Sequence, residues 1–408
     1  MYIGTREKIV LILLATLAAL TYALFSRIGL DAHGPAYDAK VRAAETTMRA
    51  GLALREVKSG DSILDQVAGD RVQAAFIGLP TSPTTTDPGS LRSKITSTNP
   101  NFAAVIVDDL RDAGVRRGDT VAISYTGSFP ALNIAAIAAA EALGAEPIIA
   151  CSVGSSTWGA NDPEFTILDM ESLLVEKGLL QHRCEAASVG GDFRLRPLTS
   201  DGRQLAEVAM QRNGVTVLSP RSLQDSVGER LDLYVREANG RRIGAFVNVG
   251  GGLPSTGAGS QRVEFSPGLS VSPPRGDIQG EGLMYFMRQR GVPVVNLTDV
   301  VHLARANRLP VAPSNTPSVG EGAVYRDWPR VRLLAILAAV GLLLGLPVVR
   351  FLVLAPSEEE EVFDAYFGFI PNRLVRRAAQ RVRHLLGLPV TAPVREARSD
   401  VGPDEGTL

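Results

Sequence analysis

The sequence has little of several residues on which protein chemistry often depends. It contains two cysteines and four histidines among 408 residues, and its formal net charge is -1. Two cysteines do not make a disulfide framework, and no CxxC motif or His/Cys cluster suggests a bound metal. A nearly neutral chain gives no indication of a nucleic-acid partner. We therefore expect no metal, no cofactor and no nucleic acid.

The two cysteines, Cys151 and Cys184, each lie near the end of a predicted strand. In an oxidising compartment two such residues can form a disulfide, and in a reducing one they stay free thiols. The sequence leaves both states open.

Charged residues are also scarce, at 21% of the chain, and the apolar residues are concentrated in two uncharged runs. The first run, 9–25, follows Arg6 and Lys8 and precedes Arg27. It reaches the lower edge of the roughly 17 to 25 residues that cross a bilayer as a helix. A cleaved signal peptide is the alternative, but the run is long for one and no clear cleavage site follows. We expect residues 1–28 to hold an uncleaved transmembrane helix.

The second run, 333–349, continues past Arg350 to Leu354. Arg350 can extend its charge to the interface, and a proline is tolerated near the end of a span. A buried helix of a soluble domain is the alternative, which is less easily reconciled with two such runs bracketing one globular segment. We expect a second transmembrane helix within 331–354.

Two spans place both termini on one side of the membrane. The segment 355–390 includes NRLVRRAAQRVRHLLG, which separates leucines and valines from arginines at helical spacing. A basic amphipathic helix of this kind suits an anionic cytoplasmic leaflet. We therefore expect a two-pass protein of the cell membrane with cytoplasmic termini and an extracytoplasmic domain. The last stretch, 391–408, has the composition of a disordered tail.

Between the spans, helical and strand-like patterns alternate. Apolar residues at helical spacing begin with Tyr37, and an Asp162–Pro163 pair predicts the start of a later helix. The strand-like runs are 120–124, 146–150, 183–192, 214–219, 242–252 and 291–296. Such alternation predicts an α/β domain with a doubly wound, mostly parallel sheet, over residues 29–310. Residues 311–330 would then be a linker.

Three of the predicted strands end in loops rich in small polar residues. In an open parallel sheet, ligands lie beyond the carboxyl ends of the strands, so these loops supply the candidate ligand-binding residues. The candidates are Ser124, Thr126, Gly127, Ser128 and Asn133 from the first loop, Ser155, Ser156, Thr157, Trp158, Asn161 and Asp162 from the second, and Asn248, Gly250 and Gly251 from the third. Strand order is not readable from sequence, so their convergence is a hypothesis.

Each loop also has a plainer explanation. The stretch SYTGSFPALN resembles a strand-loop-helix anion site, although it matches neither a P-loop nor a GxGxxG motif, and Ser and Gly are common in such turns. The Gly-, Pro- and Ser-rich segment 253–282 reads equally well as a lid or as a flexible insertion.

Catalytic signals are weak. Ser155 and Ser156 lie outside any GxSxG motif, and the domain offers only His182 and His302 as histidine partners. Four carboxylates are grouped, which allows an acid/base pair, but helix capping and solvent exposure explain them as well. They are Asp162, Glu164, Asp169 and Glu171. The sequence assigns no catalytic residue.

Three extended stretches resemble a known family: SPTTTDPGSLRSKITSTNPNFAAVIVDDL, GDTVAISYTGSFPALNIAAIAAAEALGAEPI and SVGSSTWGANDPEFTILDMESLL. Together, within about 37–306, they are similar to the poly-gamma-glutamate system proteins, bacterial membrane-associated proteins encoded beside the poly-gamma-glutamate synthesis and export machinery. The tail beyond the second span falls outside the resemblance. The family has no short catalytic signature.

The resemblance implies a role in making, exporting or anchoring an anionic polymer. The expected function is an accessory, membrane-anchored and non-catalytic protein that binds the polymer or the synthase and export subunits. Arg183, Arg194 and Arg196 would be candidates for contacting a polyanion, or would be ordinary surface residues. The alternative function is a hydrolase or transferase that acts on the polymer through the strand-end loops.

Overall fold

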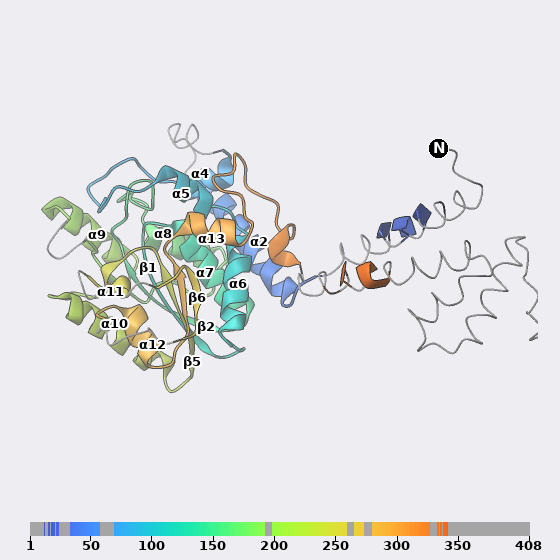
Figure 1. The fold of residues 1–408 in the computed structure, drawn as a ribbon. Coiled ribbons are helices and arrows are strands. Elements are labelled where there is room, and N and C mark those ends of the chain that lie inside the picture. Colours follow the sequence, from blue (N-terminus) through green and yellow to red (C-terminus); the bar gives the residue numbers. More distant parts are fainter. Residues whose placement is uncertain are drawn as a thin grey trace, which may run out of the picture. The chain divides into compact units, whose positions relative to one another are not determined.

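The computed structural model describes most of the central part of the chain (Figure 1). The described residues are 33–57, 69–191, 198–258, 265–272 and 280–326, with scattered positions between 12 and 23 and between 333 and 341. The chain divides into two units, of which His33–Arg326 is the compact one. The other consists of Met1–Ala32 and Asp327–Leu408.

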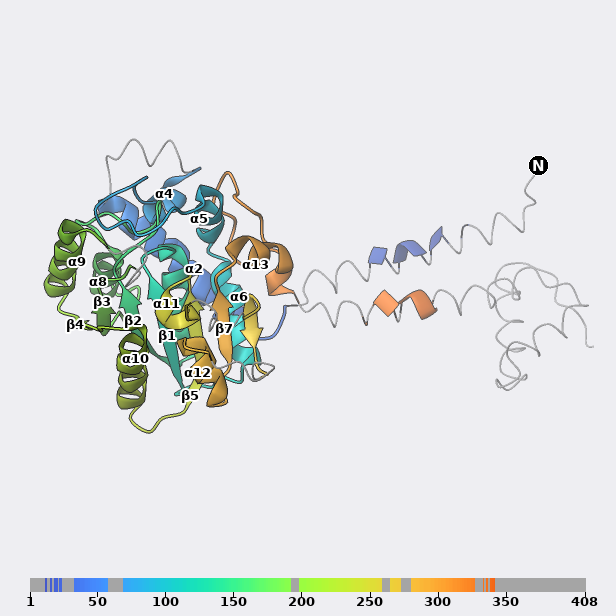
Figure 2. The ribbon, with the colours of Figure 1, turned by 60° about the vertical axis from the view of Figure 1, so that its left-hand side comes forward.

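The compact unit is an α/β domain built on a seven-stranded sheet with the order β4-β3-β2-β1-β5-β7-β6 (Figure 2). All neighbouring strands run parallel except β6, which is antiparallel to β7. The strands are β1 Thr120–Thr126, β2 Glu146–Ser152, β3 Ala186–Ser188, β4 Thr216–Val217, β5 Ile243–Val249, β6 Gly268–Ser270 and β7 Val294–Leu297. The predicted α/β class and mostly parallel sheet are confirmed.

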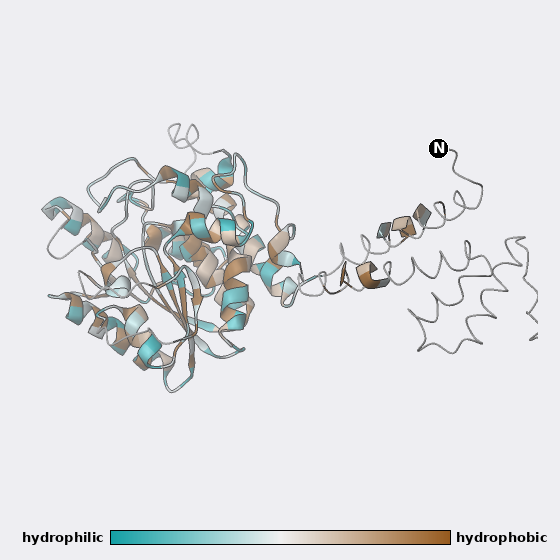
Figure 3. Cartoon of the chain, in the orientation of Figure 1, coloured by the Kyte–Doolittle hydropathy of each residue, from teal (hydrophilic) through white to brown (hydrophobic). Residues whose placement is uncertain are grey.

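Helices cover both faces of the sheet, and two separate apolar cores follow the alternation of side chains along the strands. In β1, Val121 and Ile123 point to one core and Ala122 to the other. Figure 3 shows hydrophobic residues along the central strands. The larger core holds α2 Tyr37–Val57, α6 Phe102–Asp112, α7 Pro130–Ala142, α8 Ile167–Glu176, α9 Ser200–Arg212 and α13 Val300–Ala306. The smaller one holds α10 Leu223–Ala238 and α12 Leu283–Gln289.

Helix α7 is apolar on all sides because it is buried on all sides. It packs on the sheet, and α2 and α6 pack against it. The short elements around this core are α4 Arg71–Phe76, α5 Leu91–Ser97, α11 Leu253–Thr256 and the 3-10 helix η2 Ala323–Tyr325. Helix α5 packs against α13, which brings residues 91–97 to the end of the sheet where the strand loops emerge.

The direction of winding changes between β1 and β5. From β1 the chain moves outward through β2, β3 and β4, and it then returns to β5 on the other side of β1. The helix after β1 lies in the larger core, whereas α12, which follows β5, lies in the smaller core. The loops after these two strands therefore diverge, and the crevice between them is the usual place for a ligand in this class of fold.

One local prediction is wrong. The helix predicted to start at Asp162–Pro163 begins at Ile167, because the Asp169 carboxylate accepts hydrogen bonds from the Thr166 amide and hydroxyl, both at 2.7 Å. Asp162 instead accepts a bond from the Glu164 amide in a turn. The segment 253–282 stays a predicted lid or flexible insertion, and its described residues include α11 and the edge strand β6.

The predicted linker 311–330 is part of the compact unit as far as Arg326. The Tyr325 hydroxyl donates to Asn101 Oδ1 at 2.6 Å, and Gln73 donates to the Pro313 carbonyl at 3.0 Å. These buried or half-buried bonds join the end of the domain to its beginning.

Both predicted spans, within 1–28 and 331–354, lie outside the described residues except for scattered positions, as do the predicted tails 355–390 and 391–408 entirely. Over the part of the chain that the structure describes, none of the helices combines the length and apolar character needed to cross a bilayer.

Candidate functional site

A cleft of about 800 Å³ opens at the carboxyl ends of the central strands. Its walls come from the loops after β1, β2, β3, β4 and β5, from the segment before α5, and from residues of α5, α9 and α10. Among its lining residues are Thr86, Asp87, Gly89, Ser93, Lys94, Thr126, Ser128, Phe129, Ser152, Gly154, Ser156, Ser188, Gly190, Arg203, Glu207, Ser226, Gly251 and Pro254. This volume lies in the range of roughly 300 to 1,000 Å³ that is typical of small-molecule sites.

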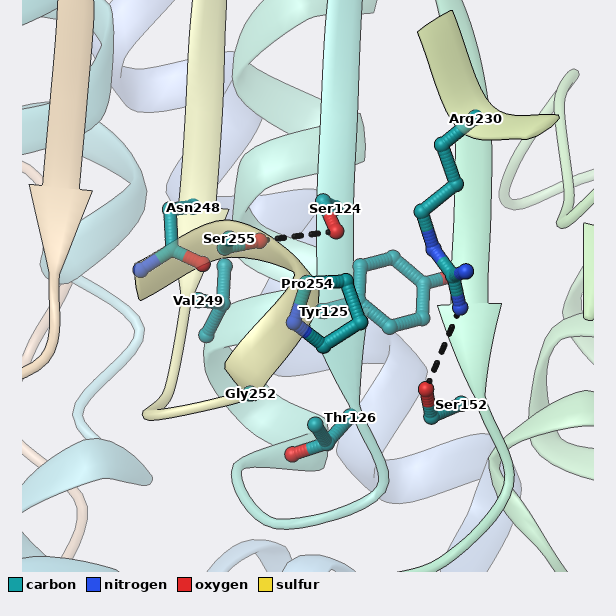
Figure 4. A pocket seen from close by; sticks show the side chains of 10 residues that line it. All are labelled: Ser124, Tyr125, Thr126, Ser152, Arg230, Asn248, Val249, Gly252, Pro254 and Ser255. Carbon is teal, nitrogen blue, oxygen red and sulfur yellow. Dashed lines mark hydrogen bonds between the residues drawn. The ribbon is translucent and has the colours of Figure 1, made fainter. Parts of the chain in front are cut away.

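The three loops singled out from the sequence lie side by side, because β1 is flanked by β2 and β5. Four of the candidate residues line the cleft, namely Thr126, Ser128, Ser156 and Gly251. Beneath the cleft lies a small cavity of about 10 Å³, which Ser124 and Asn248 line together with Arg230 and Ser255 (Figure 4). Such a volume is close to that of one water molecule.

The remaining candidates shape the loops rather than line the cleft. Gly127 permits a close approach, since a Cβ there would lie 2.8 Å from the Val153 carbonyl oxygen. Asn133 is buried and donates to the Thr126 carbonyl at 2.9 Å. Gly250 has a φ of 83°, a conformation that favours glycine. Asp162 lies outside the cleft, in the turn before α8.

The second loop, 153–161, is tied to the segment 78–89. Asn161 is fully buried, accepts from the Leu79 amide and donates to the Leu79 carbonyl. Thr157 accepts from the Gly89 amide at 2.7 Å. The Trp158 amide donates to the Leu79 carbonyl, and its φ is 64°. Ser155 is buried and pairs with Thr85 in an isolated bridge. These four candidates therefore hold the wall of the cleft.

Lys94 lies in the cleft wall and is only 2% exposed. Its ammonium nitrogen donates to Ser156 Oγ at 2.7 Å and to the Ser128 carbonyl, and it lies 4.2 Å from the centre of the Phe129 ring. No carboxylate of the described residues forms an ion pair with it. Burial lowers the pKa of Lys94 to about 7.

Arg230 lies under the floor of the cleft, on α10, and is 1% exposed. Its Nη1 atom donates to Ser226 Oγ at 2.6 Å, and its Nη2 atom donates to Ser188 Oγ at 2.8 Å and Ser152 Oγ at 3.3 Å. Its Nε atom has no hydrogen-bond partner among the described residues, where no carboxylate lies within 4.0 Å of the guanidinium either. Burial lowers the pKa of Arg230, but an arginine stays charged in proteins even so.

The hydroxyl groups of Ser152 and Ser188, next to Arg230, keep one proton that can be donated to a ligand. Ser152 and Ser188 both accept from Arg230, and their oxygens lie 3.1 Å apart. Only one of the two hydroxyls donates to the other, so one proton remains for another acceptor. Since both serines line the cleft, the floor presents a hydroxyl donor backed by a buried positive charge.

Several residues considered from the sequence lie elsewhere. Arg183 donates to Ser172 and to the Asn213 carbonyl, and Arg194 and Arg196 are outside the described residues. His182 bonds to Glu141 at 2.9 Å and Glu146 at 3.0 Å, and no Ser–His hydrogen bond appears over the described ranges. The carboxylates that are grouped in the sequence are also separated in the fold. Asp169 pairs with Arg212, whereas Glu171 lies in the core.

Glu171 is fully buried below β1, away from the cleft. It accepts hydrogen bonds from the Tyr125 hydroxyl and, at 2.8 Å, from the Cys184 amide. Burial raises the pKa of Glu171 to about 7. Cys151 and Cys184 are both buried and free. Within the described residues, no group of three His, Cys, Asp or Glu side chains is placed to hold a metal ion.

Sequence reasoning missed Lys94 and Arg230, the two buried cations described at the site. Arg230 carried a signal, because it falls at helical spacing in the buried stripe Ser226, Val227, Arg230, Leu233 and Tyr234 of α10. A charged residue in such a stripe marks a buried polar group that requires partners. Lys94 carried no comparable signal, because it lies in a short polar helix whose burial depends on distant loops. No protein-family model, curated protein or solved structure matches this chain.

Proposed function

We propose that this chain is an accessory protein of poly-gamma-glutamate synthesis and export, and that its α/β domain binds the anionic polymer in the cleft. Polymer recognition requires no cofactor. The resemblance of the three sequence stretches to the poly-gamma-glutamate system proteins supports the pathway. The chemistry of the cleft supports the class of ligand.

One observation carries the choice of an anionic ligand: Arg230 is a buried cation without a carboxylate partner over the described residues. An unpaired buried charge costs free energy, and an anion placed nearby offsets that cost. Each unit of a γ-linked glutamate polymer carries a free α-carboxylate. Such a group suits the one hydroxyl proton that Ser152 and Ser188 leave free beside the guanidinium.

Titration calorimetry tests this ligand class. The detergent-solubilised full chain is titrated with a short γ-glutamate oligomer, and with the same oligomer after amidation of its α-carboxylates. The acidic oligomer should bind, and the neutral one should bind at least about 10-fold more weakly, because charge-assisted hydrogen bonds contribute roughly 1.5 to 3 kcal/mol. Equal affinities, or no binding of the acidic oligomer, would contradict the proposal.

The same proposal places the protein in the cell membrane as a two-pass protein, with an extracytoplasmic domain and cytoplasmic termini. The two uncharged runs and the basic tail support it. A reporter that works only in the cytoplasm should be active when it is fused after Leu354. Pull-down from solubilised membranes should recover the synthase or export subunits, and recovery of none would count against the accessory role.

The alternative from the sequence is a hydrolase or transferase that acts on the polymer through the strand-end loops. A specific contact favours it as a second candidate: the 2.7 Å hydrogen bond between Lys94 and Ser156 in the cleft wall.

A further inference from the structure

We propose that Ser156 and Lys94 form a nucleophile and general-base pair that transfers the γ-glutamyl acyl group of a chain bound in the cleft. The choice of γ-glutamyl substrate rests on the proposed function, whereas the pair itself rests on geometry. Ser156 is the residue that would form the acyl intermediate, and Lys94 would move the proton.

Lys94 and Ser156 are in direct hydrogen-bond contact. Lys94 is in α5 and Ser156 is in the loop after β2, and Nζ lies 2.7 Å from Oγ. This is hydrogen-bond reach between a nucleophile and a base. Ser156 is partly exposed and lines the cleft, so a substrate carbonyl can reach its oxygen.

The surroundings of Lys94 favour a neutral amine. A neutral amine has two protons and one lone pair, so it can donate to the Ser128 carbonyl while accepting the Ser156 proton. Burial without an ion-pair partner over the described residues places the pKa of Lys94 near neutrality, at about 7. The face of the Phe129 ring, 4.2 Å away, can stabilise the ammonium once the proton has arrived.

The loops around the pair hold it in place. The Ser156 amide donates to Ser128 Oγ at 3.1 Å, which fixes the backbone that carries the nucleophile. Gly89 brings the opposite wall close, since a Cβ there would lie 3.1 Å from Ser156 Oγ and 3.0 Å from Lys94 Cε. A side chain at this position would crowd both groups.

The reaction balances without a metal, a cofactor or a redox partner. The Ser156 oxygen attacks the γ-carbonyl carbon and its proton moves to Lys94, so a C–O bond forms. The C–N bond then breaks, the proton passes from Lys94 to the leaving amine, and an ester remains on Ser156. Water, or an amine of an acceptor chain, attacks the ester with Lys94 again taking the proton, and Ser156 regains its hydrogen.

A purely structural role is the competing explanation, because Lys94 also joins three segments of the wall. The two roles differ for Lys94→Arg, which keeps the positive charge and the donors but cannot act as a base at neutral pH. A structural lysine tolerates that change better than a catalytic one. The Ser156→Ala change removes the nucleophile and its hydrogen bond to Lys94.

The test is active-site labelling of the solubilised full chain. A fluorophosphonate probe should modify Ser156, as located by peptide mass spectrometry. Labelling should vanish in Ser156→Ala and fall about 100-fold or more in Lys94→Arg and Lys94→Met, since a general base contributes roughly 10²- to 10⁴-fold. Ser200→Ala, a serine at the start of α9 outside the cleft, should label like the wild type. Melting temperatures show that each variant is folded.

The pH profile provides the second readout. Hydrolysis of a γ-glutamyl anilide should rise through a pKa near 7 as Lys94 loses its proton, and this limb should be absent in Lys94→Arg. Among the described residues, the other charged side chains that line the cleft are Asp87, Arg203 and Glu207. If the limb persists in Lys94→Arg, a group other than Lys94 is responsible and the proposal is overturned.

The outcomes separate this inference from the proposed function. A chain that binds the acidic oligomer but shows no labelling of Ser156 is a binding protein, and the catalytic pair is then wrong. A chain that is labelled at Ser156 but binds no γ-glutamate oligomer keeps the catalytic pair and loses the proposed function. Labelling that is unchanged in Lys94→Arg and Lys94→Met would also overturn the pair.

Discussion

The Nη2 atom of Arg230 lies 2.8 Å from the hydroxyl oxygen of Ser188, so a guanidinium on α10 reaches the end of β3 through the interior. The same atom reaches Ser152 at the end of β2. A buried arginine thus connects a helix of the smaller core to the floor of the cleft. In the proposed anion site, Arg230 is the residue on which binding would depend most.

Replacement of Arg230 should separate binding from folding. Arg230→Met removes the charge at similar length, and it should weaken binding of a γ-glutamate oligomer about 10- to 100-fold because a charge-assisted interaction is lost. The free energy of unfolding should change by less than the free energy of binding, because a desolvated charge is removed together with its hydrogen bonds. Calorimetry and thermal melts measure both. Unchanged affinity in a folded Arg230→Met variant would show that Arg230 only connects structural elements and does not contribute to binding.

Glu171 should make the protein less stable as pH rises from about 4.5 to about 7. Burial raises its pKa to about 7 in the folded state, so the unfolded chain ionises first and ionisation opposes folding across that window. The loss is on the order of 3 kcal/mol, at 1.36 kcal/mol per pKa unit.

Glu171→Gln should therefore be more stable than the wild type at pH 7.5 and similar to it at pH 4.5. A glutamine can still accept from the Cys184 amide and donate to the Tyr125 oxygen. Urea unfolding at the two pH values measures the difference. Equal pH dependence in the two proteins would show that Glu171 is ionised in the folded state.

Gly127 should not tolerate a side chain. A Cβ there would lie 2.8 Å from the Val153 carbonyl oxygen and 3.0 Å from Ser155 Cβ, so Gly127→Ala should cost about 1 to 3 kcal/mol. Gly228→Ala is the matched control, because a Cβ at Gly228 meets nothing within 4 Å and alanine favours a helix. Urea unfolding should show the two changes with opposite signs. Two equally mild effects would mean that the loops after β1 and β2 are further apart.

The start of α8 can be tested by its cap. Thr166→Ala should destabilise the domain by about 1 kcal/mol, as expected for loss of an N-cap residue. Asp162→Ala should cost less, since Asp162 accepts only the Glu164 amide in an exposed turn. A larger effect at Asp162 in thermal melts would favour the helix start that the sequence predicted.

The sequence predicted the central strands because they are continuous apolar runs, as in β1, β2 and β5, whose residues are almost all buried. It could not predict which strands are neighbours, because pairing joins residues far apart in the chain. The edge strand β6 escaped prediction because it is three residues long within a Gly- and Pro-rich segment.

The candidate site was predicted only in part, because its local features can be recognised in the sequence whereas contacts between distant segments cannot. Loops after strands can be recognised locally, and Thr126, Ser128, Ser156 and Gly251 do line the cleft. Lys94 and Arg230 could not be placed there, because each depends on how a separate helix packs against those loops. Asp162 was misread because a proline after an aspartate fits a turn as well as a helix start.

Photo-crosslinking tests the central claim most directly. A γ-glutamate oligomer that carries a diazirine is irradiated with the solubilised full chain, and the modified peptides are identified by mass spectrometry. Crosslinks are expected in the segments that line the cleft, 86–94, 126–129, 152–156, 188–191, 203–207, 217–226 and 251–254, and they should be lost in Arg230→Met. Crosslinks outside these segments, present equally in wild type and Arg230→Met, would contradict it.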